Sequence, residues 1–409
     1  MVERVNLNFS GFRPDIIEKV IRLLLILERI GNHAFLGSRM SLHGGTALNL
    51  FVLAMPRLSV DIDLSYVGNT DREQMLAERP AIEHAIADIA RELGFTVTIS
   101  PAEHSGRTFR LQYKGTAGLD SVKIDTNFLN RSPLLPLQRK TVVLDSGAEV
   151  TFPLNSDIEL IAGKLKALVE RVAVRDLYDT SRIAAIYPDL VAGGDERLFR
   201  RIVLYYLAKS EPFPRLLEVG DRFSGRHKDV TDTLYPMLLA GEEPHLEAMI
   251  DTAQAFLARV SRPVDTEEAD YLERFSVADF APELLFADYP DTLAAAHADP
   301  TVAWKLQNPG HVSRLAGHRA IGRHRGGRGP LPEPMLTILQ RGYIAETWNT
   351  AVPPYWTREF QCSIELPRSR RCRPCATSGS FIALPSERLI SWHGHQRGAQ
   401  RSRRCHVLA

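Results

Sequence analysis

At 409 residues, the chain is long enough for two or more domains with a sizeable core, and its formal net charge is only +1. The charge is unevenly distributed: residues 309–409 contain sixteen arginines, five glutamates and no lysine or aspartate, a net +11, so the first 308 residues carry −10. The most apolar run, 20–30, is interrupted by Arg22, Glu28 and Arg29, which excludes the ~20 apolar residues of a membrane span.

The cysteines and the first residues bear on the compartment. All four cysteines lie in 309–409, so the first 308 residues cannot form a disulfide. The opening residues, MVERVNLNFSGF, are charged and lack the pattern of a secretory leader. We therefore expect a soluble cytoplasmic protein with no membrane partner.

The first part of the chain mixes helix and strand patterns. The first helix has Pro14 at its start and Gly31 at its end. In 58–67, apolar Val60, Ile62 and Leu64 alternate with polar residues, which is the period of a strand. In chain order we expect a helix at 14–31, a strand at 38–43, a helix at 46–53, a strand at 58–67, a helix at 71–94, strands at 95–99, 108–113 and 121–129, and a hairpin at 140–153.

From about residue 155 the pattern is helical throughout. Apolar residues at positions 158, 161, 165, 168 and 172 share one helical face, and further helices are expected near 176–187, 195–208, 229–240, 244–260 and 289–298. We therefore predict an α+β protein, with a mixed sheet and flanking helices in a domain at 1–154 and an all-helical domain at 155–308.

Residues 309–409 have a different composition. They show no sustained periodicity and are rich in proline, glycine, serine and arginine. We interpret this segment as a disordered tail, or as the product of a shifted reading frame or an unrelated fusion, with the break between Asn308 and Arg314. Its CRPC motif at 372–375 has no strong zinc-site spacing.

The first chemical motif is HGGTAL at 43–48. A strand that turns through Gly44 and Gly45 into a helix offers unobstructed backbone N–H groups, an arrangement that binds phosphate. Thr46 adds a hydroxyl donor. Taken alone, a glycine pair is more often an ordinary turn.

The second motif is Asp61-Ile-Asp63. Side chains two residues apart leave the same face of a strand, and two neighbouring carboxylates repel unless a cation lies between them. Mg²⁺ is typical of such sites, with Mn²⁺ as the alternative. Asp125, on a later strand, is the candidate third carboxylate, either as a metal ligand or as the base for an attacking hydroxyl. A solvated strand face is the competing interpretation.

A third group of charges lies on the predicted helix at 157–172. Asp157, Lys164 and Arg171 are seven residues apart and are expected on one stripe away from the apolar face. Lys164 could there neutralise phosphate charge, and Asp176 and Asp179 follow on the next helix. The competing interpretation is a row of salt bridges with acidic capping. Separately, Arg57 and Ser59 are expected to support the Asp61–Asp63 strand by hydrogen bonds.

These motifs together resemble a known family. LHGGTALNLF, PRLSVDIDLSYVG, ELIAGKLKALVERVAVRDLYD (159–179) and AWKLQNP (303–309) are similar to the AbiEii/AbiGii-type nucleotidyltransferase toxins, within the DNA polymerase β-like nucleotidyltransferase superfamily. The resemblance covers roughly residues 10–308. It implies a nucleotidyltransferase core at 1–154, completed by the helical domain.

The resemblance implies roles for individual residues. Gly44, Gly45 and Thr46 would hold the triphosphate, and Asp61 and Asp63 would be metal ligands, with Asp125 a weaker match. Lys164, Arg171 and Arg175 match the family's positively charged positions and would contact the nucleotide. Asp176 and Asp179 match the family's acidic pair.

The resemblance further implies an abortive-infection toxin of a type IV toxin–antitoxin pair, with a separately encoded antitoxin. Such an enzyme transfers a nucleoside monophosphate from an NTP to an acceptor and releases pyrophosphate. The tRNA 3′ end is the expected acceptor; an RNA substrate favours a basic groove, which Arg171, Arg175, Arg182, Arg200 and Arg201 could supply. A protein side chain, an aminoglycoside-like molecule, or a non-catalytic protein are the alternatives.

Overall fold

The computed structural model describes residues 3–191, 195–210 and 219–306. The segment 309–409, its cysteines and the predicted break after Asn308 lie outside the described residues. The boundaries 1–154 and 155–308 therefore remain predictions about how the chain divides.

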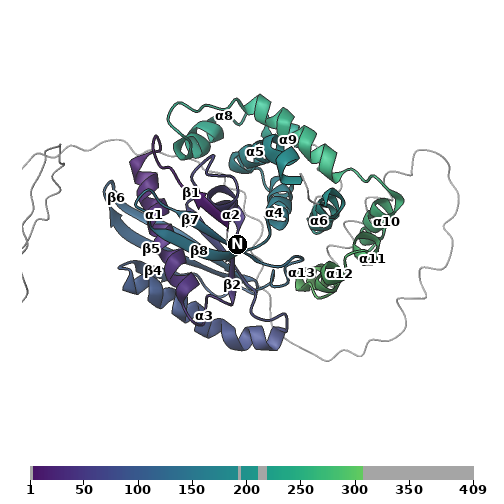
Figure 1. Ribbon diagram of the computed structural model, residues 1–409, viewed down its shortest axis with the longest axis horizontal. Helices are drawn as coiled ribbons and strands as arrows, with labels where there is room; N and C mark the ends of the chain where they lie inside the picture. The colour runs from purple at the N-terminus through teal and green to yellow at the C-terminus, as the bar shows by residue number, and fades with distance from the viewer. Residues whose placement is uncertain (1–2, 192–194, 211–218, 307–409) are drawn as a thin grey trace, which may run out of the picture. The chain divides into compact units, whose positions relative to one another are not determined.

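A mixed eight-stranded sheet forms the centre of the fold, in the order β1-β7-β8-β2-β3-β6-β5-β4 (Figure 1). Parallel pairing joins β1 to β7, β2 to β8 and β3 to β6, and the other pairs are antiparallel. The strands are β1 (Glu3–Asn6), β2 (Met40–His43), β3 (Asp61–Tyr66), β4 (Thr96–Ile99), β5 (Gly106–Gly115), β6 (Gly118–Asn127), β7 (Gln138–Val143) and β8 (Glu149–Leu154). The predicted α+β class is confirmed.

Two long helices, α1 (Pro14–Asn32) and α3 (Arg72–Glu92), lie along the sheet (Figure 1). Pro14 opens α1, where its missing N–H costs nothing. The side chain of Asp71 accepts a hydrogen bond from the backbone N–H of Gln74 and so caps α3. Both helices match the predicted ranges because their capping residues and apolar periodicity agree.

The remaining described helices are the short α2, between β2 and β3 in the chain, and the helices that follow β8. They are α2 (Gly44–Phe51), α4 (Asp157–Glu170), α5 (Val174–Val191), α6 (Glu196–Ala208), α7 (Gly220–Phe223), α8 (His227–Asp229), α9 (Leu246–Ser261), α10 (Thr266–Phe275), α11 (Glu283–Phe286), α12 (Pro290–His297) and α13 (Pro300–Leu306). No helix of the described ranges is long and apolar enough to cross a membrane.

The prediction of one continuous helix at 229–240 is wrong. This stretch contains the end of α8, a π-helical turn at Val230–Leu234 and a 3₁₀ turn at Tyr235–Met237. Pro236 lacks a backbone N–H and cannot continue an α-helix. The sequence patterns did not predict β1 or α10. β1 has only four residues, which are too few to show the alternation of a strand, and charged residues dominate α10.

The helical part is joined to the sheet part by the buried carboxylate of Glu159 on α4. It accepts hydrogen bonds from the backbone N–H groups of Leu134 and Leu135 and from the hydroxyl of Tyr206 on α6. Burial raises the pKa of Glu159, while these donors oppose that rise. One side chain thus connects α4, α6 and the loop that follows β6.

Candidate active site

Two rows of charged side chains lie on one side of the paired strands β3 and β6. The parallel register sets Asp63 beside Asp125 and Asp61 beside Lys123. Positions two residues apart on a strand share a face, so all four side chains leave the same side of the sheet. The structure therefore brings the three predicted carboxylates together, on strands separated by about sixty residues of chain.

Gly44 lies directly against this group. Its φ of +73° is a left-handed conformation that glycine adopts without strain. A Cβ atom placed on Gly44 would lie 2.1 Å from Oδ2 of Asp63, and one on Gly45 would lie 3.0 Å from Oγ of Ser59. The first residues of α2 thus pass close to the Asp63 carboxylate, with N–H groups that no helical carbonyl satisfies.

Thr46 has a different partner from the one expected. Its buried hydroxyl donates a hydrogen bond to the main-chain carbonyl of Asp61. The hydroxyl therefore connects α2 to β3 and is not directed toward a phosphate. The backbone of Thr46 remains part of the first turn of α2.

The carboxylate of Asp125 is engaged at both oxygens. The hydroxyl of Thr108 on β5 donates to Oδ1 at 2.6 Å, and the ammonium of Lys123 contacts Oδ2 at 2.8 Å. Burial lowers the pKa of Lys123, but the hydrogen bond to Asp125 and the charges of Asp61 and Asp63 outweigh it, so the pKa is raised. Lys123 is therefore a stable cation among three carboxylates.

His43 is a site residue that the sequence motifs did not identify. It lies opposite Asp63 in the β2–β3 pair, and its buried Nε2 has no hydrogen-bond partner among the described residues. Burial lowers its pKa, although Asp63 and Asp125 oppose this. The sequence feature that could have identified His43 is its position directly before Gly44, at the end of a predicted strand.

Asp63 has the environment of a cation ligand. Burial raises its pKa, and the negative charges of Asp61 and Asp125 raise it further, against the opposing effect of His43 and Lys123. The ionised carboxylate is thus electrostatically unfavourable here until a positive charge is supplied. The repulsion that the sequence predicted between paired carboxylates is therefore present around Asp63.

The predicted support residues form a buried ion-pair network beside α2. Arg57 makes two hydrogen bonds of 2.7 Å to the carboxylate of Asp179, which also accepts one from Asn49 on α2. Lys164 lies 2.8 Å from both Asp176 and Asp179. Arg57 thus supports the site through α5, and no hydrogen bond joins it to the Asp61–Asp63 strand.

The predicted stripe of Asp157, Lys164 and Arg171 is wrong. The carboxylate of Asp157 contacts Lys140 on β7, whereas Lys164 is buried against α5. Arg171 lies beyond the end of α4. Spacing by seven places residues on one side of a helix, but α4 has neighbours on several sides.

Lys164 is correspondingly a buried structural cation in this structure. Its ammonium makes ion pairs with both Asp176 and Asp179. Burial raises the pKa of Asp179, but the charges of Arg57 and Lys164 outweigh it and hold the pKa well below its usual range. The pKa of Asp176 is lowered in the same way by Lys164 and Arg171.

Arg171 and Arg175 remain the more accessible cations of this block. The Arg171 side chain is 65% exposed while its guanidinium holds Asp176 at 2.6 Å. The hydrogen bond to Asp176 raises the pKa of Arg171, and the charge of Asp63 contributes to this rise. Arg175 is half-buried and has no ion-pair partner among the described residues.

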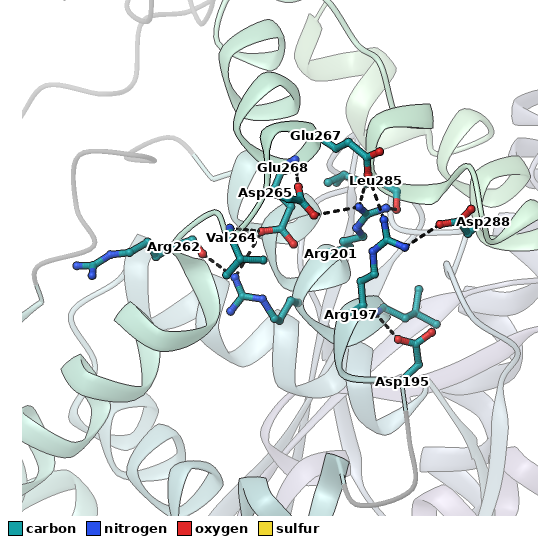
Figure 2. Close-up of polar contacts among 12 residues, drawn as sticks. Asp195, Arg197, Arg201, Arg262, Val264, Asp265, Glu267, Glu268, Leu285 and Asp288 are labelled. Carbon is teal, nitrogen blue, oxygen red and sulfur yellow. Dashed lines mark hydrogen bonds and ion pairs between the residues drawn. The ribbon is translucent and has the colours of Figure 1, made fainter.

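The expected basic groove is not formed by Arg200 and Arg201. Figure 2 shows the side chain of Arg201 directed into a polar network between α6 and the segment 262–288. Arg200 donates to the carbonyls of Arg259 and Arg262, and Arg201 donates to the carbonyl of Leu285. Both arginines are buried, so the prediction that they contact RNA is wrong.

A glycine turn lies beside paired carboxylates on a mixed sheet. This arrangement is typical of enzymes that act on phosphate groups. A family model described as "Nucleotidyl transferase AbiEii toxin, Type IV TA system" matches residues 25–308. The chain belongs to this family. It is a nucleotidyltransferase toxin of a type IV toxin–antitoxin system, and the family implies an NTP substrate, typically a divalent metal, and a separate antitoxin.

The solved structures that match the chain are distant in sequence. MenT4, a nucleotidyltransferase toxin from Mycobacterium tuberculosis H37Rv, is 18% identical with a TM-score of 0.44, over 70% of this chain and 93% of that one. JHP933 from Helicobacter pylori is 16% identical with a TM-score of 0.38, over 61% and 93%. A putative nucleotidyltransferase from H. pylori is 15% identical with a TM-score of 0.40, over 61% and 96%. No curated protein matches the sequence.

The residues of the site suit a divalent cation in part. Among residues 3–191, 195–210 and 219–306, no three His, Cys, Asp or Glu side chains form a ready-made metal site. However, Mg²⁺ is commonly held by one or two carboxylates together with substrate phosphates. Asp61 and Asp63 provide these oxygens beside the Gly44 turn, and Asp125 on the paired strand adds a further negative charge.

Proposed function

We propose that the enzyme transfers a nucleoside monophosphate from an NTP to the 3′ end of tRNA, with Mg²⁺ held by Asp61 and Asp63. One observation carries the proposal: Gly44 presents the first turn of α2 to Asp63, whose neighbour on β6 is Asp125. Phosphate-binding N–H groups, paired carboxylates and a candidate base thus lie within one small region.

The chain's own residues have separate tasks in this reaction. The N–H groups of Gly44, Gly45 and Thr46 bind triphosphate oxygens at the start of α2. Asp125 accepts the proton of the attacking hydroxyl. The hydroxyl oxygen bonds to the α-phosphorus, the bond to the bridging oxygen breaks, and pyrophosphate leaves.

Mg²⁺, when bound, supplies charge neutralisation at the phosphates and lowers the pKa of the attacking hydroxyl. The exposed Arg171 and the half-buried Arg175 supply further positive charge toward the leaving phosphates. Lys164 acts indirectly in this scheme, since its ion pairs with Asp176 and Asp179 position α5 and hence Arg175.

The acceptor is the part of the proposal that rests on family resemblance. A protein side chain or an aminoglycoside-like small molecule would use the same catalytic residues with a different acceptor surface. The burial of Arg200 and Arg201 removes two of the cations that favoured RNA, so contacts to the acceptor fall to Arg171, Arg175 and the exposed Arg182.

Labelling separates these possibilities. The protein is incubated with each α-³²P-labelled NTP, Mg²⁺, total tRNA and a protein extract, beside the Asp63→Asn variant. We expect label on tRNA with the wild type, and at least about 100-fold less with Asp63→Asn. Label on protein only, or equal labelling by the two enzymes, would contradict the proposal.

A further inference from the structure

Lys123 is positively charged at the position where the proposed chemistry needs a cation. It lies beside Asp61 in the β3–β6 register, and its ammonium contacts Asp125 at 2.8 Å on the same strand. No sequence motif pointed to this residue as part of the chemistry. It lies on the face of β6 that carries Asp125 and is paired with the face of β3 that carries Asp61 and Asp63.

Both oxygens of the Asp125 carboxylate have a partner in the structure. Thr108 donates to one oxygen and Lys123 to the other. Each oxygen keeps a second lone pair, but the positive charge of Lys123 offsets the negative charge of the carboxylate and makes it a weaker metal ligand and proton acceptor. Asp125 therefore takes part in nucleotidyl transfer more readily once it has exchanged Lys123 for another partner.

The geometry allows this exchange. The side chains of Lys123 and Asp125 each retain 36% exposure, so water and small ions reach the ion pair. The lysine stem is flexible and its ammonium is a compact point charge. By contrast, the Lys164 ion pairs are almost completely buried and cannot exchange in the same way.

We propose that Lys123 is a tethered cation that competes with a divalent metal ion for the negative charge of Asp61, Asp63 and Asp125, so that the free enzyme binds metal weakly. The inference rests on the proposed function, since it takes Asp61 and Asp63 as the metal ligands and Asp125 as the base beside them. Lys123 already neutralises part of the charge of these three groups, and a divalent ion entering the site must overcome both its repulsion and its contact with Asp125.

Metal affinity without nucleotide tests the inference. Mn²⁺ is titrated into the full chain and free Mn²⁺ is followed by its electron paramagnetic resonance signal. We expect Lys123→Met to bind Mn²⁺ at least about tenfold more tightly than the wild type, because the competing charge is gone. Lys123→Arg, which keeps the charge, and Lys114→Met, which removes an exposed lysine of β5, should stay within about twofold of the wild type.

The outcomes separate the inference from the proposed function. Unchanged or weaker Mn²⁺ binding by a folded Lys123→Met would overturn the role of Lys123, provided that the wild type binds Mn²⁺ and Asp63→Asn does not. Mn²⁺ binding that is equal in the wild type and Asp63→Asn would overturn the metal site itself. Circular dichroism of each variant verifies folding, and Lys123→Arg distinguishes loss of charge from loss of packing.

Discussion

Gly44 shows how one residue can decide whether a site exists. Its positive φ and the missing Cβ are both needed, because the Asp63 carboxylate occupies the space where a side chain would begin. A glycine pair in a sequence signals a turn, whereas the contact with Asp63 explains why only glycine fits. The backbone and the carboxylate are therefore placed as a unit.

Replacing Gly44 by alanine should impair both stability and activity. We expect a loss of about 1–2 kcal/mol in the free energy of unfolding, from the positive φ and the displaced carboxylate, and at least about 100-fold in the transfer rate. Urea unfolding and single-turnover labelling measure the two effects.

Gly94→Ala is the matched control for this substitution. Gly94 also has a positive φ, of +83°, but a Cβ there would meet no atom within 4 Å. It should lose about 1 kcal/mol of stability while keeping its transfer rate. Equal transfer rates for the two variants would show that the Gly44–Asp63 contact does not matter.

Asp179 is the residue on which the buried network depends. Removing its charge leaves Arg57 without a compensating carboxylate and Lys164 with Asp176 alone in a buried environment, so Asp179→Asn should cost about 3–5 kcal/mol at pH 7. The exposed control Asp88→Asn, which removes surface pairs with His84 and Arg91, should cost less than about 1 kcal/mol.

This stability difference should depend on pH with a defined sign. The folded-state pKa of Asp179 lies below its usual value of 3.8, so its charge contributes stability that is fully present above that value. The contribution is lost as pH falls below about 4 toward the folded-state pKa. The gap between wild type and Asp179→Asn in urea unfolding should therefore narrow at acid pH; a constant gap would argue against the network.

At the scale of elements, α6 is held to α10 and α11 by arginines that resemble surface cations in the sequence. Arg201 contacts Asp265, Glu267 and the carbonyl of Leu285, and its side chain is 1% exposed (Figure 2). Arg197, one helical turn earlier on α6, makes ion pairs with Glu267 and Asp288 at the surface. Arg201 and Arg197 differ in burial, which the residue type alone does not reveal.

Methionine substitution of these two arginines tests that difference. Arg201→Met leaves a buried carbonyl without its donor and should lower the free energy of unfolding by about 2–3 kcal/mol. Arg197→Met should lower it by less than about 1 kcal/mol. Urea unfolding of both variants makes the comparison. Similar losses would mean that the α6–α11 contact contributes little.

At the scale of the whole molecule, the described residues contain every side chain assigned to the reaction. The family match ends at residue 308, and Lys305 near that end donates to the carbonyls of Ala208, the last residue of α6, and of Ser210 just after it. Asp299 likewise binds Lys209 and Tyr205. The last described helices are therefore part of the packing of α6.

A chain that ends at Asn308 should keep its transfer rate within about twofold and its melting temperature within about 2 °C. A chain that ends at Ala298 loses Asp299 and Lys305 and should melt at least about 5 °C lower. Calorimetry and labelling make these measurements. Loss of activity in the chain that ends at Asn308 would contradict the interpretation of 309–409 as a tail or an unrelated segment.

The sequence was informative where local patterns suffice. Capping residues and periodicity predicted α1, α3 and most strands, and the motifs HGGT and DID identified the carboxylates that β3 and β6 bring side by side. It was misleading for Lys164, Arg200 and Arg201, whose helical positions suggested exposure. Their partners lie 12 to 84 residues away in the chain, where no spacing rule applies.

The sequence by itself determined the class of the fold, the family and the residue types of the site, since these depend on local propensity and short motifs. Only the tertiary structure decided which charges are free to act. Lys123 and Lys164 are both lysines near aspartates, yet one ion pair is open to water and the other is enclosed by α4 and α5. The physical reason is that burial depends on packing between distant segments, and burial sets whether a charge can exchange partners.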